Sequence, residues 1–93
     1  MEEKQKLEIL VTGKVQGVGY RRFAQRCANE LLITGWVKNE PNGSVKVVAV
    51  GNKEQLKNLI ALLRNGPPNS QVKSLEQKPF AGETNFNSFE VMQ

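Results

Sequence analysis

The spacing of apolar and polar residues divides the first half of this chain into short alternating elements. Residues 6–13 are apolar and β-prone and predict a strand. Between residues 22 and 32 the apolar spacing changes to i, i+3, i+4, i+7, which is typical of one helix face. The residues with this spacing are Ala24, Cys27, Ala28 and Leu31. Residues 35–38 predict a second strand, and the Asn-Gly pair within residues 41–43 predicts a hairpin turn after it.

The second half of the chain begins with the other arm of this hairpin and continues into a second helix. Residues 44–50 are rich in valine and predict a third strand. Asn52, followed three residues later by Gln55, has the sequence of a capping box and predicts a helix start. The apolar face of this helix is formed by Leu56, Leu59, Ile60 and Leu63. The Asn-Gly-Pro-Pro run at 65–68 predicts its end.

The remaining residues complete a recognisable order of elements. Residues 72–78 predict a fourth strand, residues 81–87 a polar loop, and residues 89–91 a short last strand. The order β-α-β-β-α-β plus a C-terminal strand predicts an α+β, ferredoxin-like (split βαβ) sandwich, with two helices on one face of an antiparallel sheet. This fold is shared by enzymes, RNA-binding domains and small-molecule sensors, so it does not determine the function.

Length and composition predict one small domain in a reducing compartment. Ninety-three residues, 39% of them hydrophobic, suit a single modest core. The N-terminus carries charges in place of an apolar leader, and no apolar stretch approaches the ~20 residues of a membrane span, so we expect a cytoplasmic protein. The single cysteine, Cys27, has no internal partner and lies on the apolar helix face, which indicates a buried small hydrophobe. The core is also expected to hold four aromatic residues: Phe23, Trp36, Phe80 and Phe89.

The residue types that the chain lacks exclude several kinds of catalytic and metal site. There is no His and no Asp, and all nine acidic residues are Glu. Ser-His-Asp and Cys-His catalysis, His-based zinc sites and EF-hand loops are therefore excluded. With one cysteine, a cysteine zinc site is excluded as well.

Positive charge and glycine gather near residue 20. The net charge is +4, and residues 14–26 hold four basic residues and no acidic one. Those four are Lys14, Arg21, Arg22 and Arg26, of which all but Arg21 are expected to be solvated. Gly13, Gly17 and Gly19 lie between the first strand and the first helix, where a curled backbone presents N–H groups to an anion. The planar guanidinium of Arg21 suits phosphate oxygens, so this segment predicts a phosphate site.

Two motifs in this order resemble those of the acylphosphatases. Residues 12–21 read TGKVQGVGYR and match the form x-G-x-V-Q-G-V-x-aromatic-R. Residues 35–39 read GWVKN, and Gly43, Val45 and Gly51 follow at the spacing of the second family motif. The resemblance covers residues 7–93, which we expect to form one acylphosphatase-like domain.

The resemblance implies a function and a set of site residues. Acylphosphatases hydrolyse an acyl phosphate to a carboxylate and inorganic phosphate, without a metal or other cofactor. It implies that Arg21 and the backbone amides of the loop hold the phosphoryl group, and that Asn39 orients the attacking water. The phosphate-binding positions it implies are Gln16, Gly17, Val18, Gly19, Tyr20 and Arg21. The implied partners are a small-molecule acyl phosphate and competing phosphate or sulfate, with no nucleic acid, no membrane and a monomeric chain.

The chain departs from the family pattern at three positions. Leu32 stands where the family tends to have glycine at the end of the first helix, so either it bears strain or the helix ends differently. Glu40 follows Asn39, although adjacent side chains on a strand point to opposite faces. Tyr20 stands where Phe is commoner.

Two other functions fit the same predicted fold. RNA-recognition domains stack bases on aromatic side chains of their sheet, but residues 44–50 contain no aromatic residue. A non-catalytic phosphate or anion sensor would keep the glycine loop and Arg21 without needing Asn39. The presence of Asn39 therefore favours the enzyme.

Overall fold

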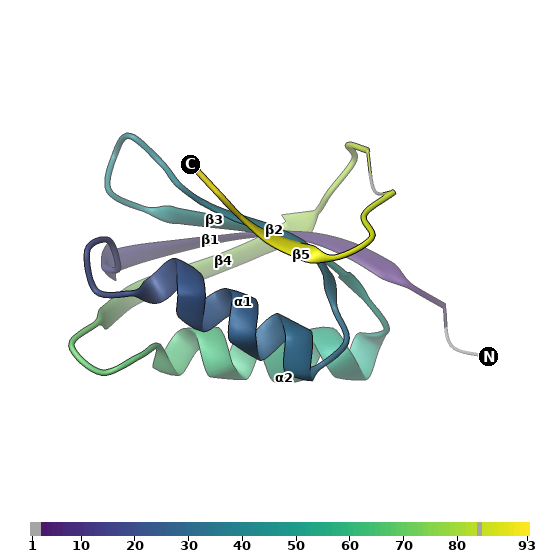
Figure 1. Cartoon of the computed structure of the whole chain (residues 1–93), viewed down its shortest axis with the longest axis horizontal. Coiled ribbons are helices and arrows are strands. Elements are labelled where there is room, and N and C mark those ends of the chain that lie inside the picture. The colour runs from purple at the N-terminus through teal and green to yellow at the C-terminus, as the bar shows by residue number, and fades with distance from the viewer. Residues whose placement is uncertain (1–2, 84) are drawn as a thin grey trace.

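The computed structural model describes residues 3–83 and 85–93, which form one sheet covered on one face by two helices (Figure 1). In chain order the elements are β1 (Gln5–Lys14), α1 (Tyr20–Glu30), β2 (Thr34–Asn39), β3 (Val45–Gly51), α2 (Lys53–Asn65), β4 (Gln71–Pro79) and β5 (Phe89–Met92). Every predicted element is present within two residues of its expected bounds. The largest difference is at α1, which begins at Tyr20 rather than Arg22 and therefore starts directly after the glycine loop.

The sheet has the order β4-β1-β3-β2-β5 and is mixed, which corrects the expectation of an antiparallel sheet. β1 pairs antiparallel with β3 and β4, and β2 pairs antiparallel with β3. β5 instead runs parallel to β2, with Gly35 opposite Phe89 and Lys38 opposite Met92. β5 follows β4, which lies on the opposite edge of the sheet, so no hairpin sets its direction relative to β2.

The core lies between the sheet and the two helices. The helices contribute Tyr20, Ala24, Cys27, Ala28, Leu56, Leu59 and Leu63, all buried. The strands contribute alternate residues, including Ile9, Val11, Val37, Val47 and Phe89. Cys27 is therefore buried, as expected. Its burial raises the pKa of the thiol, the charge of Glu30 raises it further, and Arg26 partly opposes the shift.

Two of the four aromatic residues expected in the core lie outside it. Phe89 is buried and Phe23 packs against the core. Trp36 is only half-buried, because it lies between the buried Gly35 and Val37 on β2 and thus points to the opposite face of the sheet. Phe80 is also half-buried, just beyond the end of β4.

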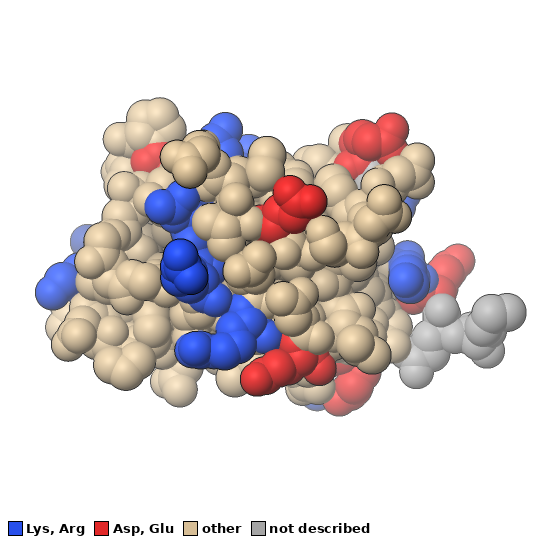
Figure 2. Space-filling model, in the orientation of Figure 1, with Lys and Arg blue, Asp and Glu red and all other residues tan. Residues whose placement is uncertain are grey.

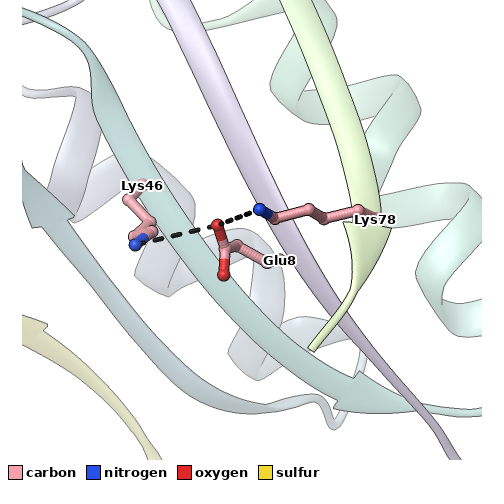
Figure 3. A network of polar contacts seen from close by, with 3 residues as sticks. All are labelled: Glu8, Lys46 and Lys78. Atoms are coloured by element: carbon pink, nitrogen blue, oxygen red, sulfur yellow. Dashed lines mark ion pairs between the residues drawn. The ribbon is translucent and has the colours of Figure 1, made fainter. Parts of the chain in front are cut away.

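The sheet face opposite the helices carries a network of two ion pairs around Glu8. Glu8 on β1 lies between Lys46 on β3 and Lys78 on β4, with an N–O distance of 3.7 Å to each (Figure 3). The Lys78 side chain is 70% exposed, so this network links three strands but adds little stability. Across the described residues, no helix is both long and apolar enough to span a membrane.

The turns that hold the helices and the hairpin use the predicted residues. Asn52 and Gln55 form the predicted capping box, with N–O distances of 2.8 Å and 2.7 Å. In the β2–β3 hairpin, the Gly43 N–H donates to the Glu40 carbonyl at 3.1 Å, and the Glu40 N–H donates to the Ser44 carbonyl at 2.8 Å. The turn therefore has three central residues, with Gly43 at φ 95°. Of its closing residues, Glu40 directly follows Asn39, so the turn holds the end of β2 in place.

Candidate active site

The connection from β1 to α1 is a loop that curls around residues 15–19. Gly17 and Gly19 have φ angles of 75° and 77°, in the left-handed region that favours glycine. Gly19 is the N-cap of α1, and no side chain caps this end of the helix. Within the described part of the chain, no backbone N–H from Gln16 to Tyr20 donates a hydrogen bond. These N–H groups at a helix N-terminus are thus available to an anion.

A pocket of about 300 Å³ opens beside this loop, and its lining residues come from distant parts of the sequence. It is lined by Val15, Gly17, Gly19, Tyr20, Arg21, Arg22, Asn39, Val91 and Gln93. The loop and the first turn of α1 form one side, and the end of β2 and the C-terminal residues form the other. Arg21 and Asn39, singled out from two separate motifs, therefore face the same pocket.

The two candidate catalytic side chains differ in their hydrogen bonding. The Arg21 guanidinium donates from Nη1 to the Met92 carbonyl at 2.7 Å, so β5 helps to aim it. An arginine has five N–H donors, and the others remain for an anion. The Oδ1 atom of Asn39 is buried without a hydrogen-bond partner among the described residues. A buried acceptor without a partner is costly in a folded protein, and such a group calls for an explanation at a candidate site.

The charge around the pocket is positive. Figure 2 shows Lys and Arg side chains gathered in a band over the N-terminal half of α1. Arg21 and Arg22 both line the pocket, whereas Glu40, the acidic neighbour of Asn39, does not. No acidic residue lies in the first turn of α1. The pocket therefore combines a helix N-terminus with two guanidinium groups, an arrangement that attracts phosphate.

Two of the residues expected to bind phosphate have side chains engaged elsewhere. The Gln16 side chain donates to the carbonyls of Glu40 and Ser44, so it joins the loop to the hairpin. The Tyr20 hydroxyl donates to the Leu63 carbonyl in the last turn of α2 at 2.6 Å. Burial, followed by the nearby Cys27, raises the pKa of this hydroxyl above its ordinary value of 10.0. Tyr in place of Phe thus serves the packing of α1 against α2.

The residues that line the pocket differ in part from the site residues expected from the sequence. Gln16 and Val18 are not among its lining residues, although their backbone amides belong to the same loop. Arg22, expected to be solvated, lines the pocket while remaining exposed. Val91 and Gln93 reach it because β5 pairs parallel with β2. The acid-free stretch around Arg22 was a usable signal, but no local signal pointed to the C-terminal residues.

Comparisons with known proteins agree with both motifs and with the fold. The sequence model of the acylphosphatase family matches residues 7–91. An acylphosphatase of Methylococcus capsulatus is 43% identical over 88 residues, which are 95% of this chain and 96% of that protein. One of Archaeoglobus fulgidus is 47% identical over 85 residues, 91% and 94% of the two chains. The crystal structure of acylphosphatase from Bacillus subtilis has a TM-score of 0.91 and 31% identity, covering 98% of this chain and all of that one. With these matches over nearly its full length, the chain belongs to the acylphosphatase family.

Proposed function

We propose that the acylphosphatase reaction takes place in the pocket between α1 and β2. Arg21 and the N–H groups of residues 16–20 hold the phosphoryl group, and Asn39 orients the attacking water. One observation gives this assignment its main support. Glycines of the phosphate-binding loop, Arg21 and Asn39 belong to two separate motifs, yet they line one pocket.

The proposed reaction requires little covalent chemistry from the protein. The water oxygen forms a bond to phosphorus, the bond from phosphorus to the acyl oxygen breaks, and a carboxylate leaves. Because a carboxylate is a good leaving group, no strong general acid is needed. The Asn39 side chain forms a hydrogen bond with the water and directs a lone pair of the water oxygen towards phosphorus, and a phosphate oxygen takes the proton. Arg21 and the loop amides stabilise the charge on the equatorial oxygens.

The side chains around the pocket favour a reaction without a metal ion. They include two guanidinium groups and two carboxamides, and no Glu side chain lines the pocket. A divalent cation prefers carboxylate or imidazole ligands, whereas a phosphoryl group prefers the donors present here. We therefore expect hydrolysis to continue in the presence of a chelator.

Benzoyl phosphate hydrolysis by purified protein, with and without chelator, tests the proposal. Arg21→Ala and Arg21→Lys are expected to lower turnover by roughly 10²–10³ and to weaken inhibition by phosphate, because lysine lacks the bidentate fork. Asn39→Ala is expected to lose turnover while phosphate still inhibits nearly as in the wild type. Arg26→Ala is the matched control, since Arg26 lies on α1 without lining the pocket.

Three results would contradict parts of this mechanism. Near wild-type activity in Arg21→Lys would contradict the proposed role of the bidentate Arg21 guanidinium. Loss of phosphate binding in proportion to turnover in Asn39→Ala would place Asn39 with the phosphate ligands. Full loss of activity in chelator, restored by a metal, would overturn the metal-free reaction.

A phosphate-binding module without catalysis is the second candidate function. It would use the same loop and Arg21, but it would have no use for Asn39 at the pocket. Phosphate binding without benzoyl phosphate hydrolysis would favour it. For the enzyme we further propose competitive inhibition by phosphate and sulfate, a monomeric domain of residues 7–93, and a cytoplasmic location without nucleic-acid or membrane partners.

A further inference from the structure

The side chain of Gln16 joins the two halves of the pocket. Its Nε2 atom donates to the Glu40 carbonyl at 2.8 Å and to the Ser44 carbonyl at 2.9 Å. Gln16 lies in the phosphate-binding loop, while Glu40 and Ser44 close the β2–β3 turn. Both hydrogen bonds therefore connect the loop to the hairpin and use up the two donors of the side-chain amide.

The carbonyls that Gln16 contacts lie directly beside Asn39. Glu40 follows Asn39 in the chain, and its N–H donates to the same Ser44 carbonyl at 2.8 Å. Asn39 itself pairs with Val45 across the two strands, one residue beyond Ser44. The Gln16 amide thus binds the backbone of the turn directly beside Asn39, the last residue of β2.

In the described part of the chain, the other side-chain hydrogen bonds of this hairpin lie within its turn. The Oδ1 atom of Asn42 accepts from the Ser44 N–H at 3.0 Å and from the Ser44 hydroxyl at 2.6 Å. These contacts shape the turn but do not reach the phosphate-binding loop. Among the described residues, Gln16 makes the side-chain hydrogen bonds that link loop and turn.

We propose that Gln16 is a positioning residue that sets the distance between the bound phosphoryl group and the water on Asn39. The inference rests on the proposed function, because it assigns the loop to phosphate and Asn39 to water. An in-line displacement depends steeply on this distance, and a misplacement of ~1 Å costs about 100-fold in rate. Gln suits the role because both partners are acceptors, so that a Glu carboxylate at this position would face two carbonyl oxygens.

Two substitutions at Gln16 and one control separate positioning from general stability. Gln16→Met keeps the length of the side chain without a donor, and Gln16→Glu keeps its shape with acceptors only. Gln25→Met is the matched control. The Nε2 atom of Gln25 also donates to a backbone carbonyl, that of Phe89 on β5, at 3.0 Å, but it contacts neither the loop nor the hairpin.

Both Gln16 variants are expected to lower kcat for benzoyl phosphate by roughly 10–100-fold. The phosphate inhibition constant should stay within about threefold, because Arg21 and the loop amides are retained. Gln25→Met should keep kcat near the wild-type value. In the double variant Gln16→Met with Asn39→Ala, kcat should fall no further than in Asn39→Ala alone, since Gln16 acts through Asn39.

Unchanged kcat in both Gln16 variants would overturn the proposal, as would additive losses in the double variant. An equal loss of phosphate affinity and kcat would also overturn it, because Gln16 would then shape the phosphate loop itself. The NMR signal of the Asn39 side-chain amide gives a readout that needs no turnover. It should shift in Gln16→Met and stay in place in Gln25→Met; the opposite result refutes the positioning role even if the proposed reaction fails.

Discussion

Replacing Leu32 with glycine tests how the C-terminal end of α1 is held. Leu32 has φ 61° and is 79% exposed. Its N–H donates to the Asn29 carbonyl at 3.1 Å, and the Ile33 N–H donates to the Ala28 carbonyl at 2.8 Å. These two bonds form a Schellman motif, in which the residue at the position of Leu32 is usually glycine. Of the two possibilities left by the sequence, the structure therefore shows the strained one.

The surrounding contacts keep Leu32 in this conformation. Ile33 and Ala28, the two positions at which the motif usually has a hydrophobic contact, are both buried in the same core cluster. The Gln55 side chain, from the capping box of α2, donates to the Leu31 carbonyl at 2.9 Å. The helix end is thus fixed from both sides, and Leu32 accepts a backbone geometry that its own side chain disfavours.

The expected gain follows from three terms of similar size. A left-handed conformation costs a residue with a Cβ about 1–2 kcal/mol, which glycine recovers. The greater freedom of glycine in the unfolded chain removes about 0.4–1 kcal/mol of this. Only about a fifth of Leu32 is covered, so its lost burial costs roughly 0.3–0.6 kcal/mol. Leu32→Gly should therefore be more stable than the wild type by about 0.4 kcal/mol.

The sharper comparison is between Leu32→Gly and Leu32→Ala. Both lose the leucine side chain, but alanine keeps the strain, so glycine should exceed alanine by about 0.8 kcal/mol. With a urea slope of about 1–3 kcal/mol per molar, the midpoints should differ by about 0.3–0.8 M. Asn69→Gly is a control, since Asn69 also has a positive φ, of 74°, but asparagine tolerates it. A midpoint for Leu32→Gly at or below that of Leu32→Ala, at equal slope, would refute the strained cap.

Two further predictions concern buried groups beside the pocket. Tyr20→Phe should lower the free energy of unfolding by about 1–3 kcal/mol, because the Leu63 carbonyl loses its hydroxyl donor; an unchanged urea midpoint would contradict this role. Stability should fall as the pH rises above about 9.0, since burial raises the pKa of the Cys27 thiol above that value and the unfolded chain loses this proton first. The urea midpoint measured between pH 7 and pH 10 should fall less in Cys27→Ala than in the wild type, and equal falls would show that another group is responsible.

The sequence alone determined the local elements, because their causes are local. A helix face, a capping box at Asn52 and an Asn-Gly turn each depend on residues a few positions apart, and the structure has all three. The family was likewise visible in two short motifs, and the family match confirms it. The position of Leu32 in the pattern marked the helix end but left strain and a different ending both open, and only the structure shows that Leu32 adopts a positive φ.

The tertiary structure decided how these elements share one pocket. β5 pairs with β2 across more than half of the chain length, so neither its parallel direction nor the approach of Met92 to Arg21 had a local cause. The same holds for Gln16, whose side chain binds carbonyls of the hairpin, and for Trp36, whose face depends on which neighbours cover β2. Local spacing specifies which residues form a helix or strand, but contacts between distant segments depend on packing the whole sheet. The sequence therefore named Arg21 and Asn39, and only the assembled sheet brought them to the same pocket.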